Sequence, residues 1–104
     1  LLEDDGFEIG AAATFGEGRD SIVGCIHPQS ILDAIDAIIS SATIPLDAIF
    51  ISCTSLKCAT IIAIAEAQYG IPVISSNSAI AWDMARLARL AMPANENGLL
   101  FQQD

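Results

Sequence analysis

The chain has 104 residues, 53% of them hydrophobic, and carries a formal net charge of −9. Its size and apolar content suit one small domain with its own core. The charge argues against nucleic acid as a partner, because phosphate backbones would be repelled. No apolar run reaches the ~18 residues of a membrane-span candidate, so no membrane partner is expected.

Cysteine usage sets the expected compartment. There are three cysteines, an odd number, and the first residues of this sequence lack the basic and apolar regions of a signal peptide, so a disulfide framework is not expected. Their spacing also lacks a zinc pattern, so we expect no metal site. We therefore expect a cytoplasmic protein. The acidic residues near the N-terminus are interpreted as a solvated face: Glu3, Asp4, Asp5, Glu8, Glu17 and Asp20.

The first predicted element is a strand over residues 6–13, although its glycines weaken a strand interior. A Gly-rich loop over 14–24 follows. The spacing of Ile31, Ile35 and Ile38 then predicts an amphipathic helix over 28–39, with Pro28 in its first turn. His27, just before it, is interpreted as a capping or surface residue, with acid–base catalysis as the alternative.

An apolar, β-branched stretch over 47–52 reads as a buried parallel strand. After a polar turn, a helix is predicted from about Leu56 to Tyr69, with Gly70 as its left-handed C′ residue. On this helix Glu66 and Gln68 are expected to face water. The residues expected to pack inward are Ile61, Ile62, Ala65 and Tyr69.

A third strand is predicted over 71–75, followed by a second polar turn, Ser75–Ser78. The last helix is predicted from about Ala79 to Ala91, capped by one of the turn residues Ser76, Asn77 or Ser78. Trp82 is expected to lie on a different face of this helix from its buried stripe, and Arg86 is expected to pair with Asp83. The buried stripe of this helix is expected to be Ile80, Met84, Leu87 and Ala91.

The element order is therefore β-α-β-α-β-α with short connections. This order indicates a single α/β domain over residues 1–104, built on a parallel sheet with right-handed crossovers. The first residue is not Met, and no helix precedes the first strand. We therefore expect the domain to be a portion of a longer chain.

The turn after the 47–52 strand carries the leading candidate for chemistry, Cys53. Ligands of open α/β sheets bind beyond the carboxyl ends of the strands. A thiol close to a helix N-terminus is favoured as a thiolate, which suits a nucleophile or an acid–base group. The N–H groups of Thr54 and Ser55, with the hydroxyls of Ser52, Thr54 and Ser55, could bind a carboxylate. The alternative is a structural cysteine.

The turn after the 71–75 strand should lie beside the first one, because the strands are parallel neighbours. Asn77 has both donors and acceptors for orienting a carboxylate, and Ser76 adds a hydroxyl. The alternative role for this turn is helix capping alone. Cys58, one helical turn beyond Cys53, is expected to pack in the core, and Cys25 is interpreted as structural.

These two turns carry a resemblance. DAIFISCTSLK (47–57), GIPVISSNSA (70–79), Trp82 and Arg86 resemble the C-terminal half of the aspartate/glutamate racemase superfamily. The most similar branch holds maleate cis–trans isomerase, arylmalonate decarboxylase and the ectoine-utilisation protein A group. The resemblance implies a three-layer, flavodoxin-like half of a pseudo-symmetric two-domain protein, with the active site between the halves. Cys53 matches the C-terminal catalytic cysteine, and Thr54 matches the residue whose N–H faces substrate.

The resemblance implies a cofactor-independent isomerase or racemase of small carboxylates or dicarboxylates, similar to maleate isomerase. The alternatives are an arylmalonate-type decarboxylase, in which Thr54 stands where Gly is expected, or a non-catalytic small-molecule-binding domain. The implied partners are a small carboxylate substrate, the missing N-terminal half of the same protein and a second copy in a homo-oligomer. The opposing cysteine is not in this sequence, so the reaction type stays open and the chain alone is expected to be inactive.

Overall fold

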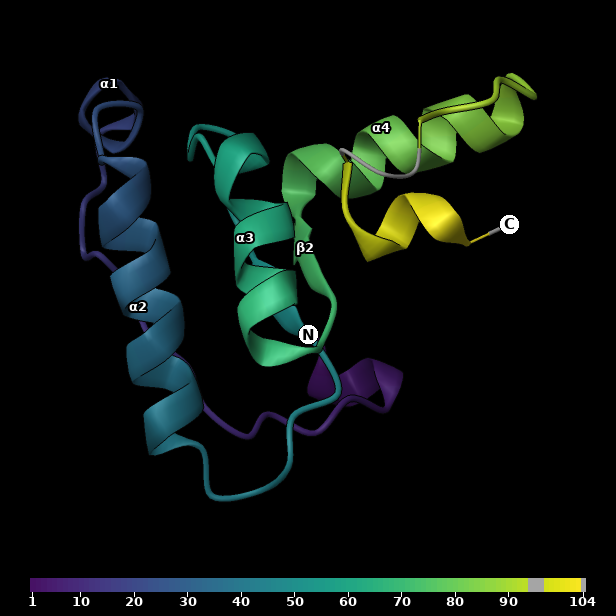
Figure 1. Ribbon diagram of the computed structural model, residues 1–104. Coiled ribbons are helices and arrows are strands. Elements are labelled where there is room, and N and C mark those ends of the chain that lie inside the picture. Colours follow the sequence, from purple (N-terminus) through teal and green to yellow (C-terminus); the bar gives the residue numbers. More distant parts are fainter. Residues whose placement is uncertain (94–96, 104) are drawn as a thin grey trace.

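The computed structural model describes residues 1–93 and 97–103 (Figure 1). Two short strands pair in parallel, with Ile49 opposite Val73 and Ile51 opposite Ser75. The elements in chain order are η1 (Glu3–Asp5), α1 (Asp20–Val23), α2 (Pro28–Ser41), β1 (Ile49–Ile51), α3 (Ala59–Tyr69), β2 (Val73–Ser75), α4 (Ser76–Leu87) and η2 (Leu99–Gln102).

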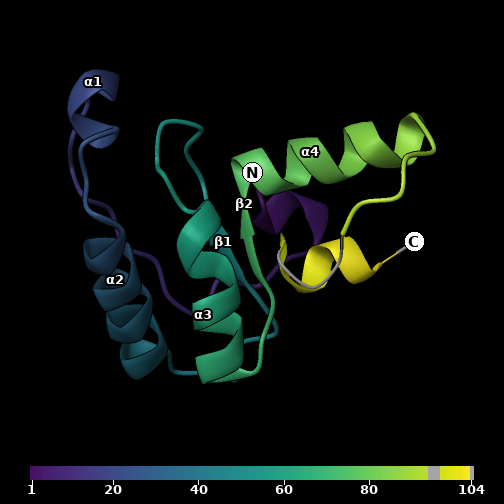
Figure 2. The same ribbon diagram turned by 45° about the horizontal axis from the view of Figure 1, so that its top comes forward.

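Helices cover both sides of this small sheet. In both views α2 and α3 lie on one side of β2, and α4 with η2 lies on the other (Figures 1 and 2). The core forms where α2 and α3 meet the strands, and its most deeply buried side chains include Ile31, Ile35 and Val73. The expected α/β class with a parallel sheet between helices is therefore confirmed. In the part of the chain that the structure describes, no helix has the length and hydropathy needed to span a membrane.

Helix α2 forms as its sequence predicts. The Nδ1 atom of His27 accepts a hydrogen bond from the Gln29 N–H at 3.1 Å, and Pro28 occupies the first helical position. This cap satisfies a backbone donor that would otherwise lack an intrahelical partner. Ile31 and Ile35 are each 2% exposed. His27 is thus a capping residue, the first of the two interpretations of its sequence position.

The predicted strand over 6–13 is wrong. The segment forms no ladder with β1, and Phe7 and Ile9 remain 61% and 43% exposed. It runs instead against the loop before β1, so closely that a Cβ at Gly10 would lie 2.7 Å from the Leu46 side chain. Short Gly and Ala side chains offer little apolar surface to hold an unpaired strand in place. The loop predicted over 14–24 also contains the single helical turn α1.

Helix α3 begins at Ala59, three residues later than predicted, and Cys58 is its N-cap residue. Its C-terminus is as expected, with Gly70 in the left-handed region at φ 72°. The water-facing placement of Glu66 is wrong, since this side chain is 7% exposed. Its carboxylate accepts hydrogen bonds from the Val73 N–H at 2.9 Å and the Leu99 N–H at 2.8 Å. These otherwise unpaired backbone donors hold the carboxylate inside.

Helix α4 starts at Ser76, earlier than predicted, and its cap is Ser75 rather than a later turn residue. The Ser75 and Ser78 hydroxyls form a reciprocal capping box, with bonds of 3.0 and 2.9 Å to each other's backbone N–H.

The predicted buried stripe of α4 is also wrong. The residue that α4 buries is Ala85, while Trp82 is half-buried and donates its indole N–H to the Gln103 carbonyl. The helix packs on β2 and η2 through this face. The stripe expected inside is exposed: Ile80 (52%), Met84 (65%), Leu87 (68%) and Ala91. The expected pair of Arg86 and Asp83 is confirmed at 2.7 Å.

Candidate functional site

Cys53 lies two residues beyond the end of β1, with its side chain half-buried. Ser52 and Thr54 beside it are exposed, and Ser55 is half-buried. Thr54 and Ser55 form a turn that precedes the N-terminus of α3 by several residues. Cys53 therefore lies in the turn after the strand, as predicted, but the later start of α3 at Ala59 places it farther from the helix N-terminus than expected.

A hydrogen bond joins the two polar turns. The Asn77 side chain, in the first turn of α4, donates through Nδ2 to the Thr54 carbonyl at 2.9 Å. The sequence prediction that parallel strands place these turns side by side is confirmed by this bond. Asn77 thus fixes the backbone next to Cys53, a positioning contact that spacing alone could not reveal. Ser76 precedes Asn77 at the start of α4 and is half-buried.

Two backbone donors in the first turn lack protein partners. Among the described residues, neither the Thr54 N–H nor the Ser55 N–H donates a hydrogen bond within the chain. Adjacent free N–H groups suit a carboxylate or a developing oxyanion. The turn can therefore bind an anion beside the Cys53 thiol.

The three thiols have different environments. Cys58 is 2% exposed and donates to the Leu56 carbonyl at 3.6 Å. Burial raises the pKa of the Cys58 thiol, and the charge of a nearby Cys53 thiolate raises it further. Cys25 is exposed and donates to the Ser21 carbonyl at 3.3 Å. Cys58 is therefore a core residue, as predicted, and Cys53 is the thiol at the strand end.

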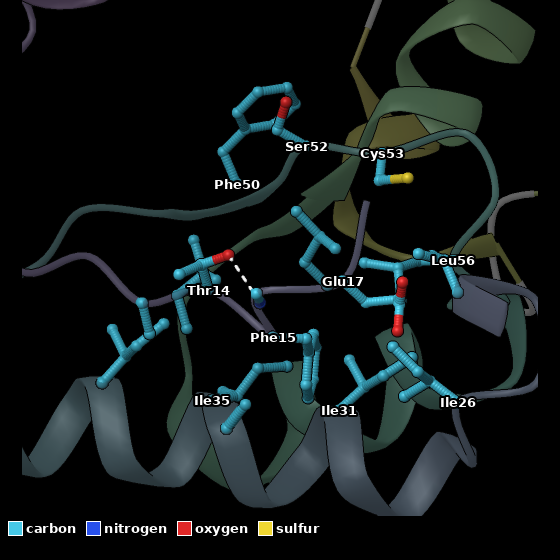
Figure 3. A pocket seen from close by; sticks show the side chains of 17 residues that line it. Thr14, Phe15, Glu17, Ile26, Ile31, Ile35, Phe50, Ser52, Cys53 and Leu56 are labelled. Carbon is cyan, nitrogen blue, oxygen red and sulfur yellow. Dashed lines mark hydrogen bonds between the residues drawn. The ribbon is translucent and has the colours of Figure 1, made fainter. Parts of the chain in front are cut away.

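A pocket of about 330 Å³ reaches Cys53 from the side of α2 (Figure 3). Ser52 and Cys53 lie at one end of it. Its other walls are mostly apolar and come from α2, from β1 and from the segment 13–17. In Figure 3 the Phe15 side chain points toward α2, which carries Ile31 and Ile35. The polar side chains of the lining are those of Ser52 and Cys53 together with Thr14 and Glu17 of the segment 13–17.

Glu17 is a pocket residue that the sequence interpretation missed by assigning it to a solvated acidic face. It lines the same pocket as Cys53 and pairs with Arg19 at 3.0 Å. The Arg19 guanidinium holds the pKa of the Glu17 carboxyl below its usual value. In the sequence, the signal for the Glu17–Arg19 pair is that an acidic and a basic residue stand two positions apart in a Gly-rich loop.

The chain is similar to known proteins in sequence and in fold. The family model described as arylmalonate decarboxylase matches residues 1–101. The chain is 30% identical over 104 residues to a maleate isomerase from Nocardia farcinica, covering 99% of this chain and 40% of that protein. The chain thus spans about two fifths of the length of that curated relative.

Two solved structures superpose on nearly the whole chain. One is the Nocardia farcinica maleate cis–trans isomerase, as a cysteine-to-serine variant with a covalently bound succinylcysteine intermediate. It has a TM-score of 0.84 and 30% identity over 99% of this chain and 41% of that chain. The other is an arylmalonate decarboxylase, with a TM-score of 0.83 and 24% identity, and the match covers 99% of this chain and 45% of that chain. At this identity the second match shows a shared fold.

Proposed function

Because the chain belongs to the arylmalonate decarboxylase family, whose model it matches over residues 1–101, we propose that Cys53 is a reacting thiol of a small-dicarboxylate cis–trans isomerase. The observation that carries this proposal is the assembled strand-end site. A half-buried thiol lies beside a turn with two free N–H donors, and Asn77 holds that turn in place.

The chemistry needs one thiolate and one proton donor. A thiolate adds to one alkene carbon of maleate, and the other alkene carbon takes a proton, which gives a succinyl thioether. The former double bond is then a single bond and can rotate. Removal of the proton and departure of the thiolate give fumarate and restore both groups. No external oxidant, reductant or cofactor enters this balance.

The relative's structure supports two reacting thiol positions. It is a cysteine-to-serine variant, and it still carries a succinyl group on cysteine. A cysteine other than the replaced one must therefore hold that adduct. In this chain Cys58 is buried, so we propose that the thiol opposite Cys53 comes from sequence outside these 104 residues. The Thr54 and Ser55 N–H groups would hold one carboxylate during the rotation.

Decarboxylation is the second candidate, favoured by the matching family model. In that reaction CO₂ leaves an arylmalonate, and the Cys53 thiol protonates the resulting enediolate. The two reactions share the thiol and the carboxylate-binding turn. We rank isomerisation first because the 30% identical relative is a maleate isomerase, and because Thr54 stands where a decarboxylase is expected to have Gly.

A chimera distinguishes the two reactions. The chain would replace the matching two fifths of the Nocardia farcinica maleate isomerase, and the chimera would be incubated with maleate and, separately, with phenylmalonate. We expect the chimera to convert maleate into fumarate, with fumarate formation measured by NMR. We expect it to release no CO₂ from phenylmalonate. The 104-residue chain alone is the control and should give neither product. Release of CO₂ without formation of fumarate by a cooperatively folded chimera would favour decarboxylation instead.

A further inference from the structure

The Gly-rich loop before α2 carries an arginine beside the pocket. The Arg19 guanidinium donates from Nε to Glu17 Oε1 at 3.0 Å and from Nη2 to Glu17 Oε2 at 3.2 Å. The Arg19 backbone N–H also donates to Glu17 Oε1, at 3.0 Å. Glu17 lines the same pocket as Cys53 (Figure 3). A carboxylate of the pocket wall therefore holds both the backbone and the side chain of Arg19 in place.

This loop reaches the turn that follows β1. The helical turn α1 comes directly after Arg19. A Cβ added to Gly24, the residue after α1, would lie 3.8 Å from the Ser55 carbonyl oxygen. In both views α1 lies at the same end of the molecule as the segment between β1 and α3 (Figures 1 and 2). The chain next to Arg19 thus borders the turn that follows Cys53.

The Arg19 guanidinium has an edge left for a second carboxylate. A guanidinium has five N–H donors in a planar fork, and Glu17 occupies the edge formed by Nε and Nη2. Among the described residues, none accepts a hydrogen bond from Nη1 of Arg19. The Arg19 side chain is 72% exposed, so a ligand can reach its free end. The edge formed by Nη1 and Nη2 can therefore bind a carboxylate through two hydrogen bonds.

A bound dicarboxylate needs a positive partner that the pocket lining does not supply. The chain has a net charge of −9, with only four Lys and Arg residues. The described residues that line the pocket include no Lys or Arg, and the Glu17 carboxylate among them would repel a substrate carboxylate. Arg19 holds the pKa of Glu17 below its usual value, so this carboxyl stays ionised at neutral pH. Arg19, bonded directly to this wall, is the cation placed to offset both charges.

We propose that Arg19 binds the second carboxylate of the substrate and so makes the site selective for dicarboxylates over monocarboxylates. Glu17 is the residue that positions the guanidinium. This inference rests on the proposed function, because it assigns a partner to the carboxylate that the Thr54 and Ser55 N–H groups do not hold.

The test uses the chimera and two unreactive ligands, succinate and butyrate, which have the same carbon chain and differ by one carboxylate. Each ligand is titrated against the rate at which iodoacetamide modifies Cys53, so the readout is binding and needs no turnover. Succinate should protect Cys53 of the parent chimera at lower concentrations than butyrate. Arg19→Gln is expected to raise the succinate concentration for half-protection about tenfold and to leave that of butyrate unchanged.

Three further variants separate position from charge. Arg19→Lys keeps the charge but loses the planar fork, so it should recover only part of the affinity for succinate. Arg89→Gln and Lys57→Gln each remove one exposed positive charge from outside the pocket lining. Because solvent and salt screen such charges, each should change succinate half-protection by less than about twofold.

Turnover of maleate gives a second readout. Arg19→Gln should raise KM for maleate about tenfold and change kcat by less than about threefold. The reason is that Arg19 acts on the charge of the substrate and not on the carbons that react.

Two results would overturn this inference while the proposed function stands. One is that the Arg19→Gln chimera converts maleate and keeps the parent's preference for succinate. The other is that Lys57→Gln, and not Arg19→Gln, removes that preference. If the parent chimera neither converts maleate nor shows protection of Cys53 by succinate, this inference and the proposed function both fail.

Discussion

Replacing Cys53 with alanine is expected to lower kcat/KM of the chimera for maleate by about 10²–10⁴-fold, the usual contribution of a positioned proton-transfer group. The loss would be at the upper end if Cys53 is the thiol that adds to the double bond, because no neighbouring side chain replaces a nucleophile. Fumarate formation by the parent and variant chimeras would be compared at several maleate concentrations.

Two controls accompany the Cys53 measurement. Cys25→Ala removes an exposed thiol outside the pocket lining and should leave kcat/KM near the parent value. Cys53→Ser keeps the size of the side chain but supplies a hydroxyl that is a much weaker acid and nucleophile, so it should resemble Cys53→Ala. A Cys53→Ala chimera with parent-like turnover would remove the proposed role of this thiol.

Glu66→Ala is expected to lower the free energy of unfolding of the chain by about 3 kcal/mol. The 7% exposed carboxylate accepts from two backbone N–H groups, those of Val73 and Leu99. Each donor left buried without a partner costs about 1–3 kcal/mol. Urea unfolding with an unchanged m-value would measure the difference.

The matched variants at this position separate charge from acceptor number. Glu66→Gln keeps one carbonyl acceptor but turns an amide donor toward the other N–H, so about half of the loss should remain. Gln68→Ala, exposed on the same helix, should change stability by less than about 0.5 kcal/mol. If Glu66→Ala has as small an effect as Gln68→Ala, the carboxylate does not hold β2 and η2.

Patterns within short stretches of the sequence were sufficient to predict α2, β1 and the end of α3. In these elements a single signal dominates: the isoleucine spacing of α2, the β-branched run of β1, and Gly70 at the end of α3. The side-by-side placement of the two polar turns followed from parallel strand pairing, and the bond from Asn77 to Thr54 confirms it.

Other features depend on partners that are distant in the sequence. The burial of Glu66 is set by the outward N–H of Val73 and by Leu99, 33 residues away. The apolar stripe of α4 gives a real helical pattern, yet packing on β2 and η2 selects the face of Ala85 instead. The segment 6–13 cannot become a strand without a paired neighbour. Composition and periodicity contain none of this information.

Maleate protection of the thiols tests the central claim, that Cys53 meets the substrate, most directly. The chimera would be treated with iodoacetamide with and without maleate, and each cysteine of this chain would be followed by peptide mass spectrometry. Maleate should slow modification of Cys53 and leave that of exposed Cys25 unchanged, while buried Cys58 reacts only after unfolding. Equal rates of Cys53 modification with and without saturating maleate would contradict the claim.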